Sequence, residues 1–197
     1  TQCILACFGA ALLAWLPEDL RGRTLFDAGC GTGHACRALL KRYGGSSVIG
    51  LDLSEGMLRE ARGRRPLLRR LDPVCADAAA LPLADDSVDL IFSNLMLQWC
   101  NDPDAVFGEF RRVLKPGGAF INSFSERWFP TKVVTLWAEL HPFERIGMVL
   151  DHYIATGFDD LQTESVRGHL RPDDDSYRGM SPFSDPVYVV TGRKPSA

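Results

Sequence analysis

From residue 23 to about residue 155, segments with two different hydrophobic patterns follow one another along the chain. Short and continuous apolar runs, such as residues 47–51 and 88–93, have the length of buried strands. Between these runs, apolar residues recur at intervals of three and four, as in Cys36, Leu39, Leu40 and Tyr43, which is typical of a helix face. This alternation predicts an α/β fold with a mainly parallel sheet and helices on both of its faces.

Seven strands are expected in all. Five fall at residues 23–27, 47–51, 73–76, 88–93 and 119–124, and two near residues 161–166 and 187–191 predict a closing antiparallel hairpin. The first 22 residues are expected to contribute a helix that Pro17 ends. Since no linker or internal repeat interrupts the pattern, we expect a single domain over residues 1–197.

Capping signals set the bounds of the helices. Ser54 can cap the helix after the second strand, and Asp102 followed by Pro103 opens another helix. The sequence Lys-Pro-Gly-Gly at residues 115–118 is expected to stop that helix. A longer helical region, from residue 130 to about residue 156, is expected to break near residues 141–142 and to end at Gly157.

Composition narrows the class of protein. The 22 basic and 25 acidic residues give a net charge of −3, which argues against a general nucleic-acid binder. The six cysteines are dispersed in a chain larger than most disulfide scaffolds, so we expect reduced thiols and a cytoplasmic protein, or an organellar one if a targeting segment has been removed. Without CxxC or HxxxH spacing, no metal site is expected. The apolar stretch at residues 3–16 is too short to span a bilayer, so no membrane span is expected either.

Candidate chemistry gathers where the expected strands end. A glycine loop follows the first strand, acids follow the second and third, and a polar pair closes the fourth; the residues are Asp27-Ala28-Gly29-Cys30-Gly31-Thr32-Gly33, Asp52, Asp77 and Ser93-Asn94. Ligands of open parallel sheets bind at these carboxyl ends, where an acid after the second strand can accept from ribose hydroxyls. Taken singly, the same residues could be a tight turn, a helix cap, a surface turn and a strand end.

The details of the loop favour a cationic nucleoside over a dinucleotide. The dinucleotide pattern GxGxxG, counted from Gly29, requires a third glycine where this chain has His34. A carboxylate at Asp27 would repel a pyrophosphate but attract a cationic group. S-adenosylmethionine carries a sulfonium and an ammonium group, and it meets both conditions.

At these residues the chain resembles the class I S-adenosylmethionine-dependent methyltransferases of the small-molecule kind, which include the ubiquinone and menaquinone C-methyltransferases. The matching segments are residues 27–33, residues 51–54 with Met57, residues 76–78 with Leu81-Pro82, and residues 110–118. Residues 93–100, Ser-Asn-Leu-Met-Leu-Gln-Trp-Cys, also resemble malonyl-carrier-protein O-methyltransferases. The resemblance implies a Rossmann-like doubly wound fold, with a cofactor-binding half at residues 23–124 and an acceptor-side half at residues 125–197.

The resemblance also implies roles for single residues. Gly29, Cys30, Gly31 and Gly33 would line the methionyl part and ribose of S-adenosylmethionine, and Asp27 would hold its ammonium group. The remaining predicted contacts are Asp52 to the ribose, Leu53 and Met57 beside the adenine, Asp77 and Ala78 at the adenine edge, and Asn94 near the sulfonium. The product would be S-adenosylhomocysteine.

The sequence gives fewer signals for the part of the site that would bind the methyl acceptor than for the cofactor-binding part. Transfer from a sulfonium is an in-line displacement that depends mainly on proximity and orientation, so no catalytic base is assigned. Candidate acceptor contacts are Gln98, Trp99, Trp128 and His169, and further candidates for a base are Glu126, Arg127 and Tyr177. Each of them could equally be a rim or packing residue. Because few residues precede the first strand, a lid over the acceptor is expected to be missing, mobile or borrowed from another subunit.

The main expectation is therefore O- or C-methylation of a small-molecule acceptor. The alternatives are an RNA or protein methyltransferase and a non-catalytic relative that binds the cofactor or a partner. The basic run Arg62, Arg64, Arg65, Arg69 and Arg70 could serve RNA or an acidic acceptor, or it could be a solvated face.

Overall fold

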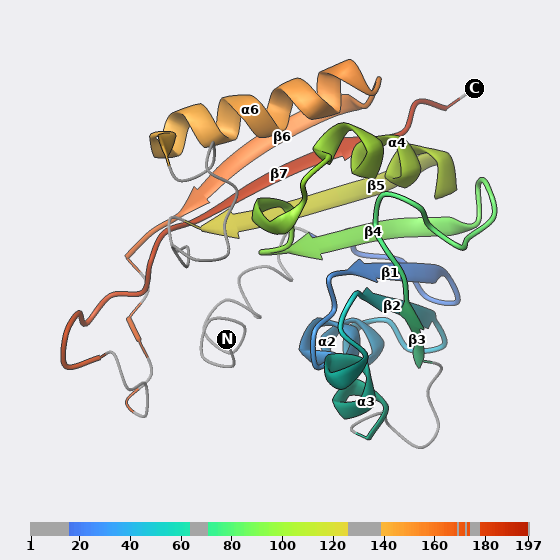
Figure 1. Ribbon diagram of the computed structural model, residues 1–197, viewed down its shortest axis with the longest axis horizontal. Coiled ribbons are helices and arrows are strands. Elements are labelled where there is room, and N and C mark those ends of the chain that lie inside the picture. The colour runs from blue at the N-terminus through green and yellow to red at the C-terminus, as the bar shows by residue number, and fades with distance from the viewer. Residues whose placement is uncertain are drawn as a thin grey trace.

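The computed structural model describes residues 16–63, 71–125, 139–168, 170–171, 173 and 178–196. Within them seven strands form one sheet in the order β3-β2-β1-β4-β5-β7-β6 (Figure 1). The strands are β1 (Thr24–Ala28), β2 (Ser47–Asp52), β3 (Leu71–Cys75), β4 (Val88–Asn94), β5 (Leu114–Ser125), β6 (Asp159–Val166) and β7 (Val187–Arg193). The first five run parallel, and β7 is antiparallel to both β5 and β6. The predicted parallel sheet with a closing antiparallel hairpin is confirmed.

The helices begin at the capping residues that the sequence indicates. In α3 (Glu55–Gly63), the Met57 amide lies 3.4 Å from the Ser54 hydroxyl. In α4 (Pro103–Val113), the Asp102 carboxylate accepts from the Ala105 amide at 3.0 Å. The predicted break near residue 141 is the start of α6 (Pro142–Ala155), where His141 and Glu144 form a capping box.

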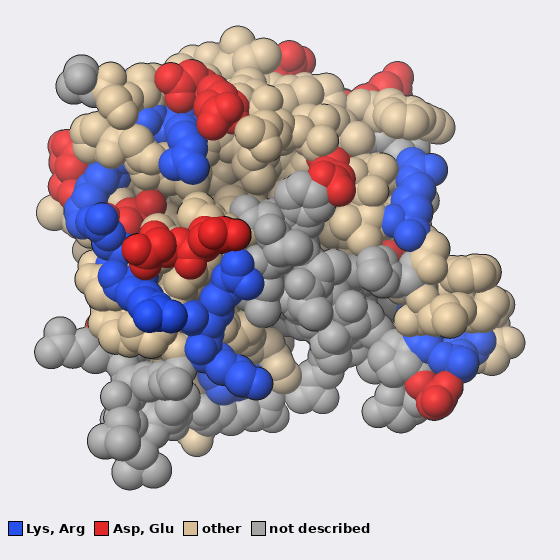
Figure 2. All heavy atoms as spheres, turned by 180° about the vertical axis from the view of Figure 1, so that it is seen from behind, with Lys and Arg blue, Asp and Glu red and all other residues tan. Residues whose placement is uncertain are grey.

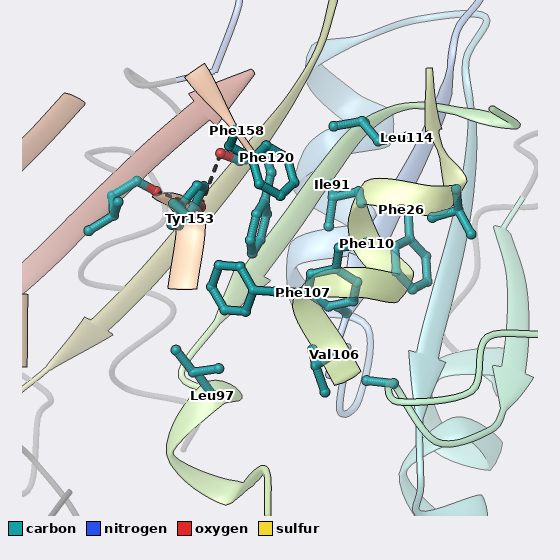
Figure 3. Packing of buried hydrophobic residues seen from close by; sticks show 14 of the residues in the cluster. Phe26, Ile91, Leu97, Val106, Phe107, Phe110, Leu114, Phe120, Tyr153 and Phe158 are labelled. Carbon is teal, nitrogen blue, oxygen red and sulfur yellow. Dashed lines mark hydrogen bonds between the residues drawn. The ribbon is translucent and has the colours of Figure 1, made fainter. Parts of the chain in front are cut away.

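Helices pack on both faces of the sheet and make a separate apolar core on each. On one face, α4 and α6 bury an aromatic cluster: Phe107 and Phe110 point toward Phe120 on β5, beside Tyr153 (Figure 3). The Phe120 and Tyr153 rings stack with centroids 4.8 Å apart, and the Tyr153 hydroxyl lies 3.1 Å from the Val190 carbonyl oxygen. On the other face, α2 (His34–Arg42) buries Cys36, Leu39 and Leu40, as its spacing predicts.

The starts of β5 and β3 differ from the prediction for reasons that the strand pairing explains. The strand β5 begins at Leu114, directly after α4, so residues 115–118 end the helix but lie inside a strand. The pairing of Val88 with Leu114 and a shift in register before Leu90 accommodate this glycine-containing segment. Similarly, β3 begins two residues earlier than predicted because Leu71 pairs with Val48.

Several predictions concern residues outside the described ranges. The helix expected before Pro17 lies largely there, and residues 16–22 contain bends and turns only. The same holds for most of the basic run after α3 and for the helix expected to begin at residue 130. Among the helices that are described, none combines the length and the apolarity needed to cross a membrane.

Candidate functional site

The glycine loop after β1 is clamped to the end of β2. The amides of Gly29 and Cys30 both donate to the Leu51 carbonyl oxygen, at 2.9 and 2.8 Å. Gly29 has a φ of 74°, and a Cβ at this position would lie 2.6 Å from the Met96 side chain in the loop after β4. No side chain fits there without displacing Met96, so the sharp turn and the close approach both require glycine.

Asp52 joins this loop to the start of α3. One of its carboxylate oxygens accepts from the Gly31 amide at 2.9 Å, and the other accepts from the Ser54 amide at 2.8 Å. The sequence predicted that these strand ends converge, and the structure brings Gly31 and Asp52 into direct contact. Each carboxylate oxygen has a second lone pair, so Asp52 can still accept from the two hydroxyls of a ribose.

A buried carboxylate lies beneath the loop. Asp27 is 1% exposed, and the Cys36 thiol donates to it at 3.0 Å. Burial raises the pKa of Asp27 to about 6, against hydrogen bonds from Cys36 that lower it, and the nearby charge of Asp52 raises it further. No cationic side chain of the described residues contributes to this shift. At neutral pH the site therefore holds a largely uncompensated negative charge that a cationic ligand would stabilise.

Apolar surface and a second carboxylate border the site at the ends of β2 and β3. Leu53 and Met57 are 70% and 45% exposed. The exposed Asp77 uses one carboxylate oxygen to accept from the Ala79 amide at 2.9 Å, and the neighbouring Ala78 is buried. A flat apolar ring with a polar edge fits this combination, because its faces would cover the apolar side chains while its edge meets the acid.

The end of β4 supplies the other wall. The Asn94 side-chain oxygen accepts from the Ser123 hydroxyl on β5 at 2.7 Å, which fixes the amide at the edge of the sheet. In the short helix η1 (Leu97–Trp99), Gln98 is buried, and the Trp99 indole donates to the Leu95 carbonyl oxygen at 2.8 Å. The other proposed acceptor contacts and base candidates, Trp128, His169, Glu126, Arg127 and Tyr177, lie outside the described residues.

The sequence interpretation missed two polar features near this edge. Cys36 was assigned only to an apolar helix face, yet its thiol contacts Asp27. Asn122 lies on β5 opposite Ser93, inside the strand predicted at residues 119–124, and no role is predicted for it. The Asn122 amide and the Ser93 hydroxyl are fully buried and have no hydrogen-bond partner among the described residues. A polar residue inside an otherwise apolar strand was the signal that could have found Asn122.

Replacing Asn122 by Leu is expected to raise the free energy of unfolding by about 1–3 kcal/mol, because an unpaired buried amide costs about that much. Urea unfolding of the wild type and of Asn122→Leu measures the difference. Ser123→Ala is a useful comparison, since it breaks the bond to Asn94 and should destabilise the chain instead. Destabilisation by Asn122→Leu would mean that this amide has a partner after all.

The described cysteines, Cys30, Cys36, Cys75 and Cys100, are free thiols. Within the described ranges, no three His, Cys, Asp or Glu side chains lie together in a way that could hold a metal ion.

Comparison with known proteins agrees with this geometry. Residues 26–122 match the family model described as a methyltransferase domain. A solved S-adenosylmethionine-dependent methyltransferase from Mesorhizobium loti superposes with a TM-score of 0.70 at 25% identity, over 95% of this chain and 97% of that one. The chain belongs to the class I S-adenosylmethionine-dependent methyltransferases.

Within that class its sequence is similar to the malonyl-[acyl-carrier protein] O-methyltransferases. It is 50% identical to the Methylovorus enzyme over 110 residues, which cover 53% of this chain and 37% of that protein. It is 44% identical to the Gallionella capsiferriformans enzyme over 173 residues, which cover 77% of this chain and 60% of that protein. The match thus spans between about a third and three fifths of these relatives.

Proposed function

We propose that this chain transfers a methyl group from S-adenosylmethionine to the free carboxylate of a carrier-bound malonyl group, forming a methyl ester. The observation that carries the proposal is the contact between Gly31 and Asp52 above the buried Asp27, which suits a cationic nucleoside. The acceptor is proposed from the names of the relatives. It is a narrower form of the small-molecule O- or C-methylation that the sequence predicts.

The residues at the strand ends fit the cofactor part by part. Asp27 would hold the ammonium group, Gly29, Cys30, Gly31 and Gly33 would pack along the methionyl part, and Asp52 would accept from the ribose hydroxyls. At the adenine, Leu53 and Met57 would cover the ring and Asp77 with Ala78 would meet its edge. Asn94 would lie near the sulfonium, held by Ser123.

With such an acceptor the reaction would need no general base. S-adenosylmethionine, when bound, supplies a methyl group already activated for displacement, because the electron pair of the broken S–C bond neutralises the sulfonium. A carboxylate acceptor is ionised at neutral pH and has no proton to lose. The chain then contributes mainly orientation: the clamped glycine loop and the fixed Asn94 amide set the cofactor against the acceptor. We propose Gln98 and Trp99 as acceptor contacts. Trp128 and His169, which lie outside the described residues, are proposed as further contacts on the sequence alone.

Charged side chains of both signs lie side by side on one face of the described residues. Figure 2 shows Lys and Arg side chains lying next to Asp and Glu side chains over the described part of one face. Several of them are paired, as in Lys115 with Asp89 at 3.0 Å and Lys194 with Asp86 at 2.6 Å. Basic side chains that are paired in this way are poor candidates for nucleic-acid contacts, which use unpaired ones.

We also propose that the chain forms one domain, because the sheet runs without interruption from the cofactor-binding half into β6 and β7. The free thiols of Cys30 and Cys36 favour a reducing compartment such as the cytoplasm.

Two measurements test this function. S-adenosylmethionine or S-adenosylhomocysteine at about 100 times its dissociation constant should stabilise the chain by about 2.7 kcal/mol in thermal unfolding, with no response to NAD. Mass spectrometry should then find a methyl ester on malonyl-acyl carrier protein. A response to NAD alone would refute the cofactor. Methylation of a quinone but not of the malonyl thioester would refute the acceptor.

A further inference from the structure

The connection between β3 and β4 has no helix of its own. Residues 76–87 contain only turns and bends, although they carry the chain from the carboxyl end of β3 past β2 and β1 to the amino end of the parallel strand β4. Such crossovers usually contain a helix, which satisfies its own backbone hydrogen bonds. A crossover without one needs partners elsewhere for its buried amides and carbonyl groups.

Two side chains of α4 supply these partners. The Glu109 carboxylate accepts from the Leu81 amide at 2.7 Å. The Arg112 guanidinium donates to the carbonyl oxygens of Leu83 at 2.8 Å and Leu81 at 3.1 Å, and to the Asp85 carboxylate at 2.7 Å. Glu109 and Arg112 thus replace the hydrogen bonds that a crossover helix would have made.

The two side chains also fix each other. Arg112 makes two hydrogen bonds to Glu109, both of 2.7 Å, in the bidentate geometry that orients a guanidinium. These bonds lower the pKa of Glu109, so the pair stays ionised at neutral pH. Further along the connection, the amides of Asp86 and Ser87 donate to the carbonyl oxygens of Arg112 and Val113. The crossover is therefore held by α4 from residue 81 to residue 87.

This attachment lies a few residues from Asp77. The Ala80 amide donates to the Asp77 carbonyl oxygen at 3.1 Å, and the Ala79 amide donates to the Asp77 carboxylate at 2.9 Å. Ala78 and Leu81, on either side of this turn, are both 6% exposed and pack into the same core. A displacement of Leu81 would consequently move the whole turn that presents Asp77.

We propose that Glu109 and Arg112 are positioning residues that hold the Asp77 turn for recognition of the adenine edge. This inference rests on the proposed function, because it assigns Asp77 to the cofactor. The hydrogen bonds that the two side chains make run to the crossover and to each other, and not to the glycine loop or to Asp52. The pair therefore acts on the adenine end of the site and not on its ribose end.

The test compares two ligands by isothermal titration calorimetry. S-adenosylhomocysteine carries the adenine amino group, whereas S-inosylhomocysteine carries a carbonyl oxygen in its place, which a carboxylate disfavours. The wild type should prefer S-adenosylhomocysteine. In Arg112→Ala, the affinity for S-adenosylhomocysteine should fall about tenfold, while the affinity for S-inosylhomocysteine should change little. The preference for the adenine ligand should therefore largely disappear. The matched control is Arg111→Ala, since Arg111 is the adjacent residue of α4 and donates toward the Gly157 carbonyl oxygen instead.

Conservative variants keep the test decisive if Arg112→Ala folds poorly. Glu109→Gln retains a side-chain oxygen for the Leu81 amide and should keep more of the preference than Glu109→Leu does. A lysine at this position cannot reach all the groups that accept from Arg112, so Arg112→Lys should lose part of the preference for S-adenosylhomocysteine. The inference is wrong if the folded variants weaken both ligands equally, or if they match Arg111→Ala. If the wild type binds neither ligand, the proposed function itself fails.

Discussion

Replacing Asp27 by Asn is expected to stabilise the folded chain at pH 8 and to weaken S-adenosylmethionine binding. The pKa of Asp27 is about 6 in the folded chain, compared with an ordinary value of 3.8, so the folded state binds this proton more tightly than the unfolded state. The stability that protonation contributes is complete below about pH 4 and is lost as pH rises through about 6. A difference of about two pKa units corresponds to about 3 kcal/mol.

The neutral amide of the Asp27→Asn variant would avoid that loss. Its oxygen can still accept from the Cys36 thiol, which lies 3.0 Å from the wild-type carboxylate. Urea unfolding between pH 4 and pH 8 should therefore show the advantage of Asp27→Asn growing from near zero to about 3 kcal/mol. The exposed Asp151 provides the control, since Asp151→Asn should show no such growth. An Asp27→Asn variant that is less stable than the wild type at pH 8 would contradict the prediction.

Asp27→Asn should lower the affinity for S-adenosylmethionine, although it raises the stability of the folded chain. The ionised Asp27 attracts an ammonium group and a neutral amide does not, so affinity for S-adenosylmethionine at pH 8 should fall about tenfold or more. In the wild type, affinity should rise as pH increases through about 6, and in Asp27→Asn this rise should be absent. A residue that improves binding at the expense of stability is typical of a functional site.

Much of this site followed from one rule about parallel sheets. Once the strands were assigned from their apolar runs, Asp27, Asp52, Asp77 and Asn94 had to lie at the same edge, and the contact between Gly31 and Asp52 confirms the convergence. The rule needs only the direction and end of each strand. It does not depend on packing details that the sequence leaves open.

The features that escaped prediction all depend on distant partners. Cys36 has the spacing of an apolar helix face, and only the packing of α2 on β1 reveals that its thiol contacts Asp27. Glu109 and Arg112 have the spacing of a solvated helix face, while their partners on the crossover lie 27 to 31 residues away. The early start of β5 has the same origin, because the pairing of Leu114 with Val88 is a tertiary contact.

Removing the Asp52 carboxylate is expected to weaken cofactor binding more than Asp27→Asn does. In the structure both of its oxygens accept from backbone amides, those of Gly31 and Ser54, and in the proposed complex they also accept from two ribose hydroxyls. Hydrogen bonds to a charged acceptor contribute about 1.5–3 kcal/mol each. Asp52→Ala should thus weaken S-adenosylhomocysteine binding by about a hundredfold or more.

Asp52→Asn distinguishes the ribose contacts from a general loss of charge. Its amide group offers one oxygen and two N–H donors, so it must turn the donors toward either the Gly31 or the Ser54 amide. Affinity should therefore fall substantially in Asp52→Asn as well, though less than in Asp52→Ala. Calorimetry gives the affinities, and circular dichroism confirms that each variant is folded. Asp72→Ala, which removes an exposed acid on the neighbouring β3, should bind like the wild type. If Asp52→Ala binds as tightly as Asp72→Ala, Asp52 is only a loop and helix cap, and the ribose must bind elsewhere.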